Sequence, residues 1–181
     1  MLYQFNIHLT EEDYVAFNQF HSFESPQGKK LIRNSRMILT LVMVVLAALI
    51  FLVDGLSSFA VTYAIVLGLF TVFYVVGFQK IMNRVIRKQI KTLKKTGKLP
   101  FDPVSTFEFY EDRMAEITTS RHTEQRYDAI EQVCVVREQY LLLYTSSVGA
   151  YILPIPQLRQ QGNLEELLSF LMQKCGKVAY Y

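Results

Sequence analysis

Two long apolar runs dominate the pattern of hydrophobic and polar positions along this chain. The first covers residues 37–53 and the second covers residues 59–78, and neither contains an Asp, Glu, Lys, Arg or His. The break between them, Asp54-Gly-Leu-Ser-Ser58, is short and polar. A bilayer core of about 30 Å is crossed by a helix of about 20 apolar residues. The runs therefore predict a two-helix transmembrane hairpin. The alternative is a hairpin buried in a water-soluble globule, but too little other apolar sequence remains to wrap it.

Basic residues flank the apolar hairpin on both sides and are absent from its loop. Residues 29–98 carry a net charge of +11, whereas residues 1–28 and 99–181 each carry −4, which gives the total of +3. Because cytoplasmic flanks are enriched in Lys and Arg, both termini are expected on the cytoplasmic side of the plasma membrane. The first apolar helix would then be an uncleaved anchor. The basic character belongs to the membrane flanks and gives no reason to expect a nucleic-acid partner.

The segment from Gln79 to Gly97 is expected to continue the second helix as a basic stalk. Its apolar residues recur at helical spacing, namely Ile81, Val85, Ile86, Ile90 and Leu93. Lysines and arginines occupy the other positions, as in helices that lie along or emerge from an anionic leaflet. The candidate contacts to anionic lipid are Arg84, Lys88, Lys91 and Lys95. In the alternative interpretation these residues only set the topology and solvate the stalk. Gly97 and Pro100 are expected to end the helix.

Beyond Pro100 the hydrophobic period changes from helical to alternating. The expected strands are Val104–Tyr110, Arg113–Thr119, Thr123–Ala129, Gln132–Arg137, Tyr140–Thr145 and Ala150–Pro154. An amphipathic helix then follows over Leu164–Lys174, with Asn163 as the expected N-cap. The pattern predicts a small, strongly bent antiparallel sheet that this C-terminal helix closes.

The N-terminal segment also shows a strand pattern. Apolar and polar residues alternate from Leu2 to Leu9, and Thr10-Glu-Glu-Asp13 resembles a capping box that opens a helix. Since the predicted topology places this segment beside the distal domain, we expect its strand to join the distal sheet. The chain is thus a membrane α+β protein in three parts. Residues 1–28 pack on the distal domain, residues 29–98 form the hairpin and stalk, and residues 99–181 form the β-rich domain.

Three small residues lie four apart on the second apolar helix, namely Ala60, Ala64 and Gly68. Small side chains at this spacing allow close helix packing in membranes. The simplest partner is the first helix, through Ala47 or Ala48, and the alternative is a homo-oligomer in the membrane.

Four short motifs are distinctive, namely Thr10-Glu-Glu-Asp-Tyr14, Tyr127-Asp-Ala-Ile130 with Val133, Tyr140-Leu-Leu-Leu-Tyr144 and Ala150-Tyr-Ile-Leu-Pro154. In these motifs and in the order of its parts, the chain resembles the bacterial YcxB-like family of two-pass membrane proteins. The chain departs from the family pattern after Pro154, where Ile155 and Pro156 replace a usual basic residue. The resemblance implies a pleckstrin-homology-like cytosolic domain, and a family without an established enzymatic activity. It supplies no catalytic residues.

The remaining chemistry indicates no enzyme, metal or cofactor. Cys134 and Cys175 are expected to be free thiols in a reducing compartment. The three histidines, His8, His21 and His122, show no metal-ligand spacing. The favoured hypothesis is a membrane-tethered binding or regulatory module that holds a protein partner or a lipid headgroup at the inner leaflet. The alternatives are an immunity protein against a membrane-active peptide and an accessory subunit of a larger membrane complex.

Overall fold

The chain folds into two compact units. The computed structural model describes residues 1–181 apart from Lys98, Pro100, Val148 and Lys177. One unit, the β unit, comprises Met1–Phe17 and Thr92–Tyr181, and the other, the hairpin unit, comprises Asn18–Lys91. The expected helix-ending role of Pro100 lies outside the described residues.

The first sheet of the β unit contains the N-terminal strand. Its order is β1 (Tyr3–His8), β2 (Val104–Phe109), β3 (Arg113–Thr118) and β4 (His122–Arg126), all antiparallel. Phe5 is opposite Phe107, and both side chains are buried. The alternation of apolar residues in β1 explains this pairing, because a strand with one apolar face needs a core to cover it.

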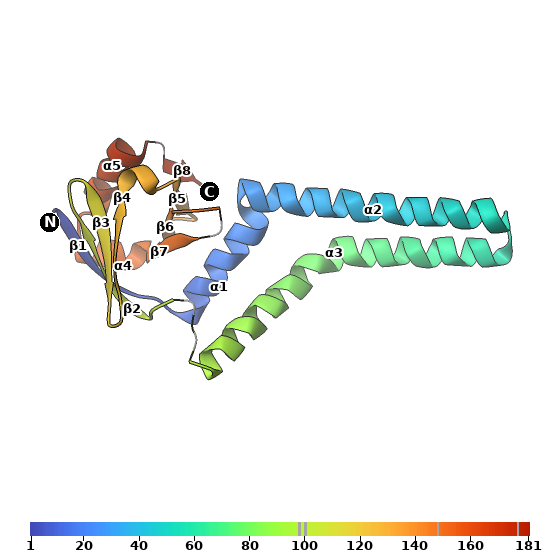
Figure 1. Cartoon of the computed structure of the whole chain (residues 1–181), viewed down its shortest axis with the longest axis horizontal. Helices are drawn as coiled ribbons and strands as arrows, with labels where there is room; N and C mark the ends of the chain where they lie inside the picture. Colours follow the sequence, from blue (N-terminus) through green and yellow to red (C-terminus); the bar gives the residue numbers. More distant parts are fainter. Residues whose placement is uncertain (98, 100, 148, 177) are drawn as a thin grey trace. The chain divides into compact units, whose positions relative to one another are not determined.

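The second sheet has the order β7-β6-β5-β8. It consists of β5 (Gln132–Val136), β6 (Tyr140–Tyr144), β7 (Ala150–Pro154) and the short β8 (Val178–Tyr180), which runs parallel to β5. Arg137 and Glu138 both have positive φ between β5 and β6, as a type I′ hairpin turn requires. The described strands thus form two four-stranded sheets, and the prediction of one bent sheet is wrong in this respect (Figure 1).

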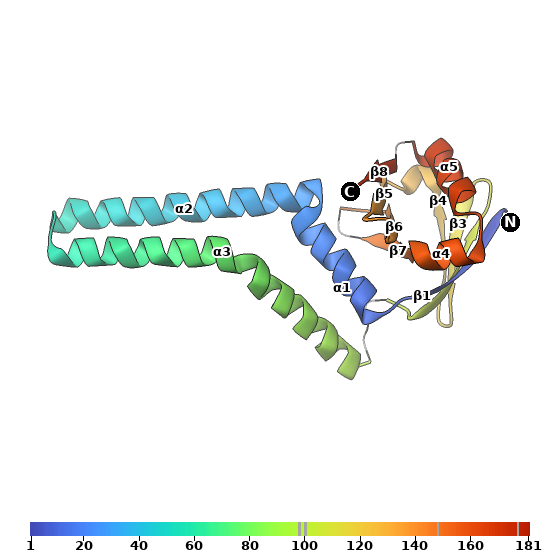
Figure 2. The same ribbon diagram turned by 180° about the vertical axis from the view of Figure 1, so that it is seen from behind.

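Within the described residues two helices lie between β7 and β8, of which the sequence predicted one. α5 (Leu164–Cys175) is the expected closing helix, and it buries Leu164, Leu167 and Leu171 in the core shared by both sheets. α4 (Ile155–Gln161) was not predicted, although a proline in the first turn is compatible with a helix. It contacts β1 of the first sheet and β7 of the second (Figure 2).

Asn163 behaves differently from the prediction. It occupies the N-cap position of α5 in the left-handed conformation, and within the described residues its side chain makes no capping hydrogen bond. Its backbone carbonyl instead accepts a hydrogen bond from the Leu167 amide at 2.9 Å. Asn163 therefore supports the first turn of α5 through its backbone rather than through its side chain.

The segment Tyr127–Ala129 is also not the strand end that was expected. It forms the 3₁₀ helix η2, and β4 ends at Arg126. The Tyr127 hydroxyl donates to backbone carbonyls of Tyr110 and Arg113 at 2.9 Å each, an interaction that fixes η2 against the turn between β2 and β3.

Helix α1 (Glu11–Gln19) begins with the predicted capping box. The Asp13 amide donates to the Thr10 hydroxyl at 3.2 Å, and the Asp13 carboxylate accepts from the Thr10 amide at 2.9 Å. A π-helical turn, η1 (Phe20–Glu24), follows, and α2 begins at Pro26.

The hairpin unit consists mainly of α2 (Pro26–Asp54) and the first part of α3 (Ser58–Lys95). The predicted apolar runs, residues 37–53 and 59–78, lie inside these longer helices. Figure 1 shows the two helices running side by side from a short loop at which the chain reverses, and α3 bending partway along its length. The expected stalk is helical, because α3 continues without interruption to Lys95.

Candidate membrane surface and interhelical groove

The apolar side chains of α2 and α3 are largely exposed. In the most apolar window of each helix, 0% of α2 and 6% of α3 is buried. Leu52 and Val76, for example, are 81% and 72% exposed. Soluble proteins rarely expose continuous apolar surface of this kind, and a core helix would bury it. Both helices are long and apolar enough to cross a membrane, and the buried-hairpin alternative does not fit the described residues.

A stripe of buried and half-buried side chains follows the hairpin at heptad-like spacing. On α3 it contains Ala60, Ala64, Leu67, Thr71 and Tyr74, of which Ala60 is fully buried and the others are half-buried. This spacing of three and four residues is typical of shallow helix crossings. The hydroxyl groups of Ser35 on α2 and Tyr74 on α3 form a hydrogen bond of 3.1 Å between the two helices.

The predicted small-residue face is only partly used in this packing. Ala60 and Ala64 belong to the stripe, and on α2 Ala47 is half-buried while Ala48 is exposed. Gly68 is exposed, and a methyl group added to it would meet no described atom within 4 Å. Within this chain Gly68 therefore lies outside the stripe, which passes through Leu67, and contact of Gly68 with a second copy stays a prediction.

The four basic residues predicted to contact lipid share one face of α3. Arg84, Lys88, Lys91 and Lys95 follow one another at intervals of four, three and four residues, and all are exposed. On the opposite side Ile86 is half-buried and Ile90 is buried. Ile81 and Val85, which belong to the predicted apolar face, are exposed within the chain.

The basic end of α3 forms a salt bridge with α1 within the β unit. The Lys94 ammonium donates to the Glu11 carboxylate, and this hydrogen bond and charge raise the pKa of Lys94. Nearby on α1, the Asp13 carboxylate accepts from the Tyr140 hydroxyl at 2.8 Å. Burial and this hydrogen bond raise the pKa of Tyr140 to about 12. Acidic residues of α1 thus connect the start of that helix to both the stalk and β6.

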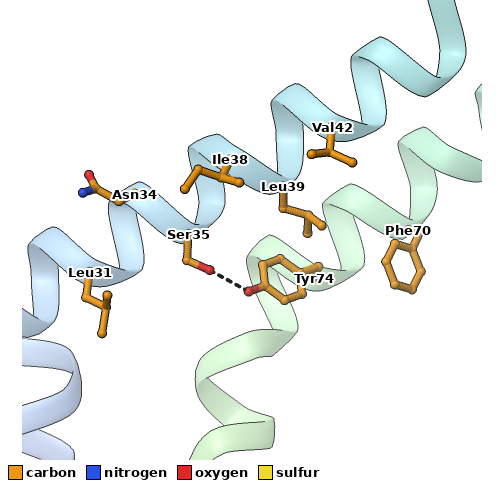
Figure 3. Close-up of a pocket in the computed structure, with 8 residues that line it drawn as sticks. All are labelled: Leu31, Asn34, Ser35, Ile38, Leu39, Val42, Phe70 and Tyr74. Atoms are coloured by element: carbon orange, nitrogen blue, oxygen red, sulfur yellow. Dashed lines mark hydrogen bonds between the residues drawn. The ribbon is translucent and has the colours of Figure 1, made fainter. Parts of the chain in front are cut away.

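A groove lies between α2 and α3, and no feature of the sequence had indicated it. Its volume is about 650 Å³, and Figure 3 shows the side chains that line it. They are Leu31, Asn34, Ser35, Ile38, Leu39 and Val42 from α2, with Phe70 and Tyr74 from α3. Most of these residues are apolar, and the Ser35–Tyr74 hydroxyl pair lies among them. The position of a groove depends on how the helices cross, which an apolar run cannot specify.

The titratable groups of the β unit serve packing and turns. Burial raises the pKa of the Cys134 thiol to about 11 and also raises that of Cys175, and both cysteines are free. Glu165 and Glu166 lie in the first turn of α5, where negative charge is favourable to the helix dipole. Among the described residues, no group of three or more His, Cys, Asp and Glu side chains could hold a metal ion.

Fold and surface together define a two-helix apolar hairpin attached to a β unit with a closing helix. The chain matches no protein-family model, no curated protein and no solved structure at a similarity that indicates relationship.

Proposed function

We propose that α2 and α3 cross the plasma membrane as a hairpin and tether the β unit to the cytoplasmic face. The support for this proposal is the exposed apolar surface of both helices. The basic residues on both flanks, and their absence from the loop, favour an orientation in which both chain ends are cytoplasmic.

We also propose that the β unit is of the pleckstrin-homology-like type and that the chain belongs with the bacterial YcxB-like proteins. Seven of its strands, β1 to β7, form antiparallel pairs in two sheets, and α5 follows them as the closing helix. The strand count and the closing helix agree with the resemblance seen in the sequence. The hairpin would then be an insertion between the first and second strands of the domain.

The function that this arrangement supports best is that of a non-catalytic binding or regulatory module at the inner leaflet. One observation carries the proposal: a helix with an exposed apolar portion continues into a portion with four basic residues on one face. Such a helix would place its basic face at the level of the anionic headgroups, where each basic residue contributes about 1 kcal/mol of attraction. The acidic β unit, which lies after this face in the chain, would then be free to hold a partner.

Lysine footprinting of the full chain in nanodiscs tests this proposal. Discs of zwitterionic lipid are compared with discs containing anionic phosphatidylglycerol, and acetylation rates are measured at each lysine by mass spectrometry. Lys88, Lys91 and Lys95 should be acetylated several-fold more slowly in the anionic discs, and the difference should shrink at high salt. Lys174 on α5 is the internal control and should not change. Equal rates at the three stalk lysines in both discs would refute the anionic contact.

A further inference from the structure

The groove between α2 and α3 has a polarity gradient along its length. Val42 and Phe70 lie toward its fully apolar end, while the Ser35–Tyr74 hydroxyl pair and Asn34, together with the apolar Leu31, lie toward the other end (Figure 3). In a hydrogen bond between two hydroxyl groups, the accepting hydroxyl keeps its own O–H as a donor. The polar end of the groove can therefore donate to a further acceptor, such as an ester carbonyl.

Basic residues follow the groove-lining residues along both helices. On α3 the face of Tyr74 leads through Gly77 and Ile81 to Arg84 at intervals of three and four residues. On α2 the exposed Lys30 lies one turn before Asn34. Arg84 is about 9 Å beyond the end of the second apolar run, and Lys30 is about 10 Å before the start of the first. These offsets correspond to the headgroup layer, into which long basic side chains can reach.

We propose that this groove holds one acyl chain of an anionic phospholipid from the cytoplasmic leaflet, with its phosphate between Lys30 and Arg84. The inference rests on the proposed membrane insertion and adds a specific lipid site to it. The volume of about 650 Å³ lies within the range of roughly 300–1,000 Å³ that is usual for ligand sites. The ligand chemistry follows from the gradient, since the site offers apolar walls, then a hydroxyl donor, then positive charge.

A second copy of the chain fits this groove less well than a lipid. Two copies inserted in the same orientation would place their basic flanks at the same level of the membrane. Like charges would then meet at the polar end of the groove, which disfavours that association. An anionic phospholipid neutralises the same charges.

Native mass spectrometry of the full chain in a mild non-ionic detergent tests the site. Phosphatidylglycerol or phosphatidylcholine is titrated, and the fraction of chain that carries one lipid is measured. Val42→Trp fills the groove, and Val44→Trp, on the opposite face of α2, is its matched control. Ile38→Trp is a second groove-filling variant, chosen because Ile38 is an exposed wall residue whose enlargement disturbs no core. The paired change Lys30→Gln with Arg84→Gln is compared with Arg33→Gln with Arg87→Gln, which keeps the same net charge.

The expected result is that the unmodified chain retains phosphatidylglycerol at least about fivefold better than phosphatidylcholine. The groove-filling variants should lose about fivefold in retention, and the Lys30 and Arg84 pair should lose the headgroup preference, while both controls behave like the unmodified chain. Equal loss in variants and controls, or equal retention of the two lipids, would overturn the proposal. A dimer that Val42→Trp abolishes would also overturn it, because the occupant would then be a second copy.

The membrane fraction of each variant is measured first, so that two failures can be told apart. Recovery of the unmodified chain in the soluble fraction would contradict the membrane insertion itself. Recovery in the membrane without a groove-dependent lipid adduct would contradict only the lipid site.

Discussion

Two glutamines of α4 occupy the place of a neighbouring strand along the free edge of β1. The Gln161 side chain accepts from the Asn6 amide and donates to the Asn6 carbonyl, each at 2.8 Å. The Gln157 side chain makes the same pair of bonds with His8, again at 2.8 Å. Unpaired strand edges invite association with other chains, and these amides cover this one.

Removing both amides should loosen β1. A net contribution of about 0.5 kcal/mol per bond, the low end for solvent-exposed hydrogen bonds, gives about 2 kcal/mol for the four bonds. Each glutamine makes two of the four bonds, so the loss at Asn6 and at His8 is about 1 kcal/mol each. A loss of 1 kcal/mol corresponds to about a fivefold change in the local opening equilibrium. In the Gln157→Ala, Gln161→Ala variant, the β1 amides at Asn6 and His8 should therefore exchange about fivefold faster.

Hydrogen exchange of the full chain, followed by mass spectrometry of the N-terminal peptide, measures this effect. The exposed Gln160 on the same helix provides the control, and Gln160→Ala should leave β1 exchange unchanged. Gln161→Glu offers a sharper test, because a carboxylate can accept from the Asn6 amide but cannot donate to its carbonyl. Protection should be partly lost at pH 7 and should recover as the pH falls below about 4, where the side chain regains a proton. Unchanged exchange in the double alanine variant would refute the reasoning.

Three further predictions concern packing and reactivity. Leu167 on α5 is fully buried, so Leu167→Ala should lower the free energy of unfolding of the β unit by about 2–5 kcal/mol, while Met172→Ala on the exposed side should change it by less than about 0.5 kcal/mol in denaturant titration. A methyl group at Gly28 would lie 2.5 Å from the His21 carbonyl oxygen, so Gly28→Ala should cost about 1–3 kcal/mol and lower the thermal midpoint; an unchanged midpoint would show that the turn before α2 can relax. Because burial raises the pKa of Cys134 to about 11, its thiol should resist maleimide below pH 9 until denaturant is added, and rapid labelling of the native chain would contradict its placement in the core.

Much of the fold could be predicted from hydrophobic spacing, and the failures have identifiable causes. The alternation in residues 2–9 predicted a strand, and the expected topology, which places this segment beside the distal domain, predicted its pairing with the distal sheet. β8 is only three residues long, too short for a period to be seen. Helix α4 was not predicted because Pro154 and Pro156 lie at its start, and proline disfavours a helix except in the first turn.

The candidate sites depended more strongly on three-dimensional geometry. The basic face of α3 could be derived from spacing alone, because one long helix fixes which residues share a face. The exposure of Gly68 within the chain could not be derived, because residues four apart drift around a helix with 3.6 residues per turn, whereas the stripe follows alternating steps of three and four. The groove at Ser35 and Tyr74 also required the crossing of two helices.

The central claim is that the loop between α2 and α3 lies outside the cell and the β unit lies inside. Single cysteines in a Cys134→Ala, Cys175→Ser background test it with a membrane-impermeant maleimide applied to intact spheroplasts. Leu56→Cys, at a loop position that is 90% exposed, should be labelled at once, whereas Gln160→Cys on α4 should be labelled only after lysis. Labelling of Gln160→Cys in intact spheroplasts, or protection of Leu56→Cys until lysis, would contradict the account.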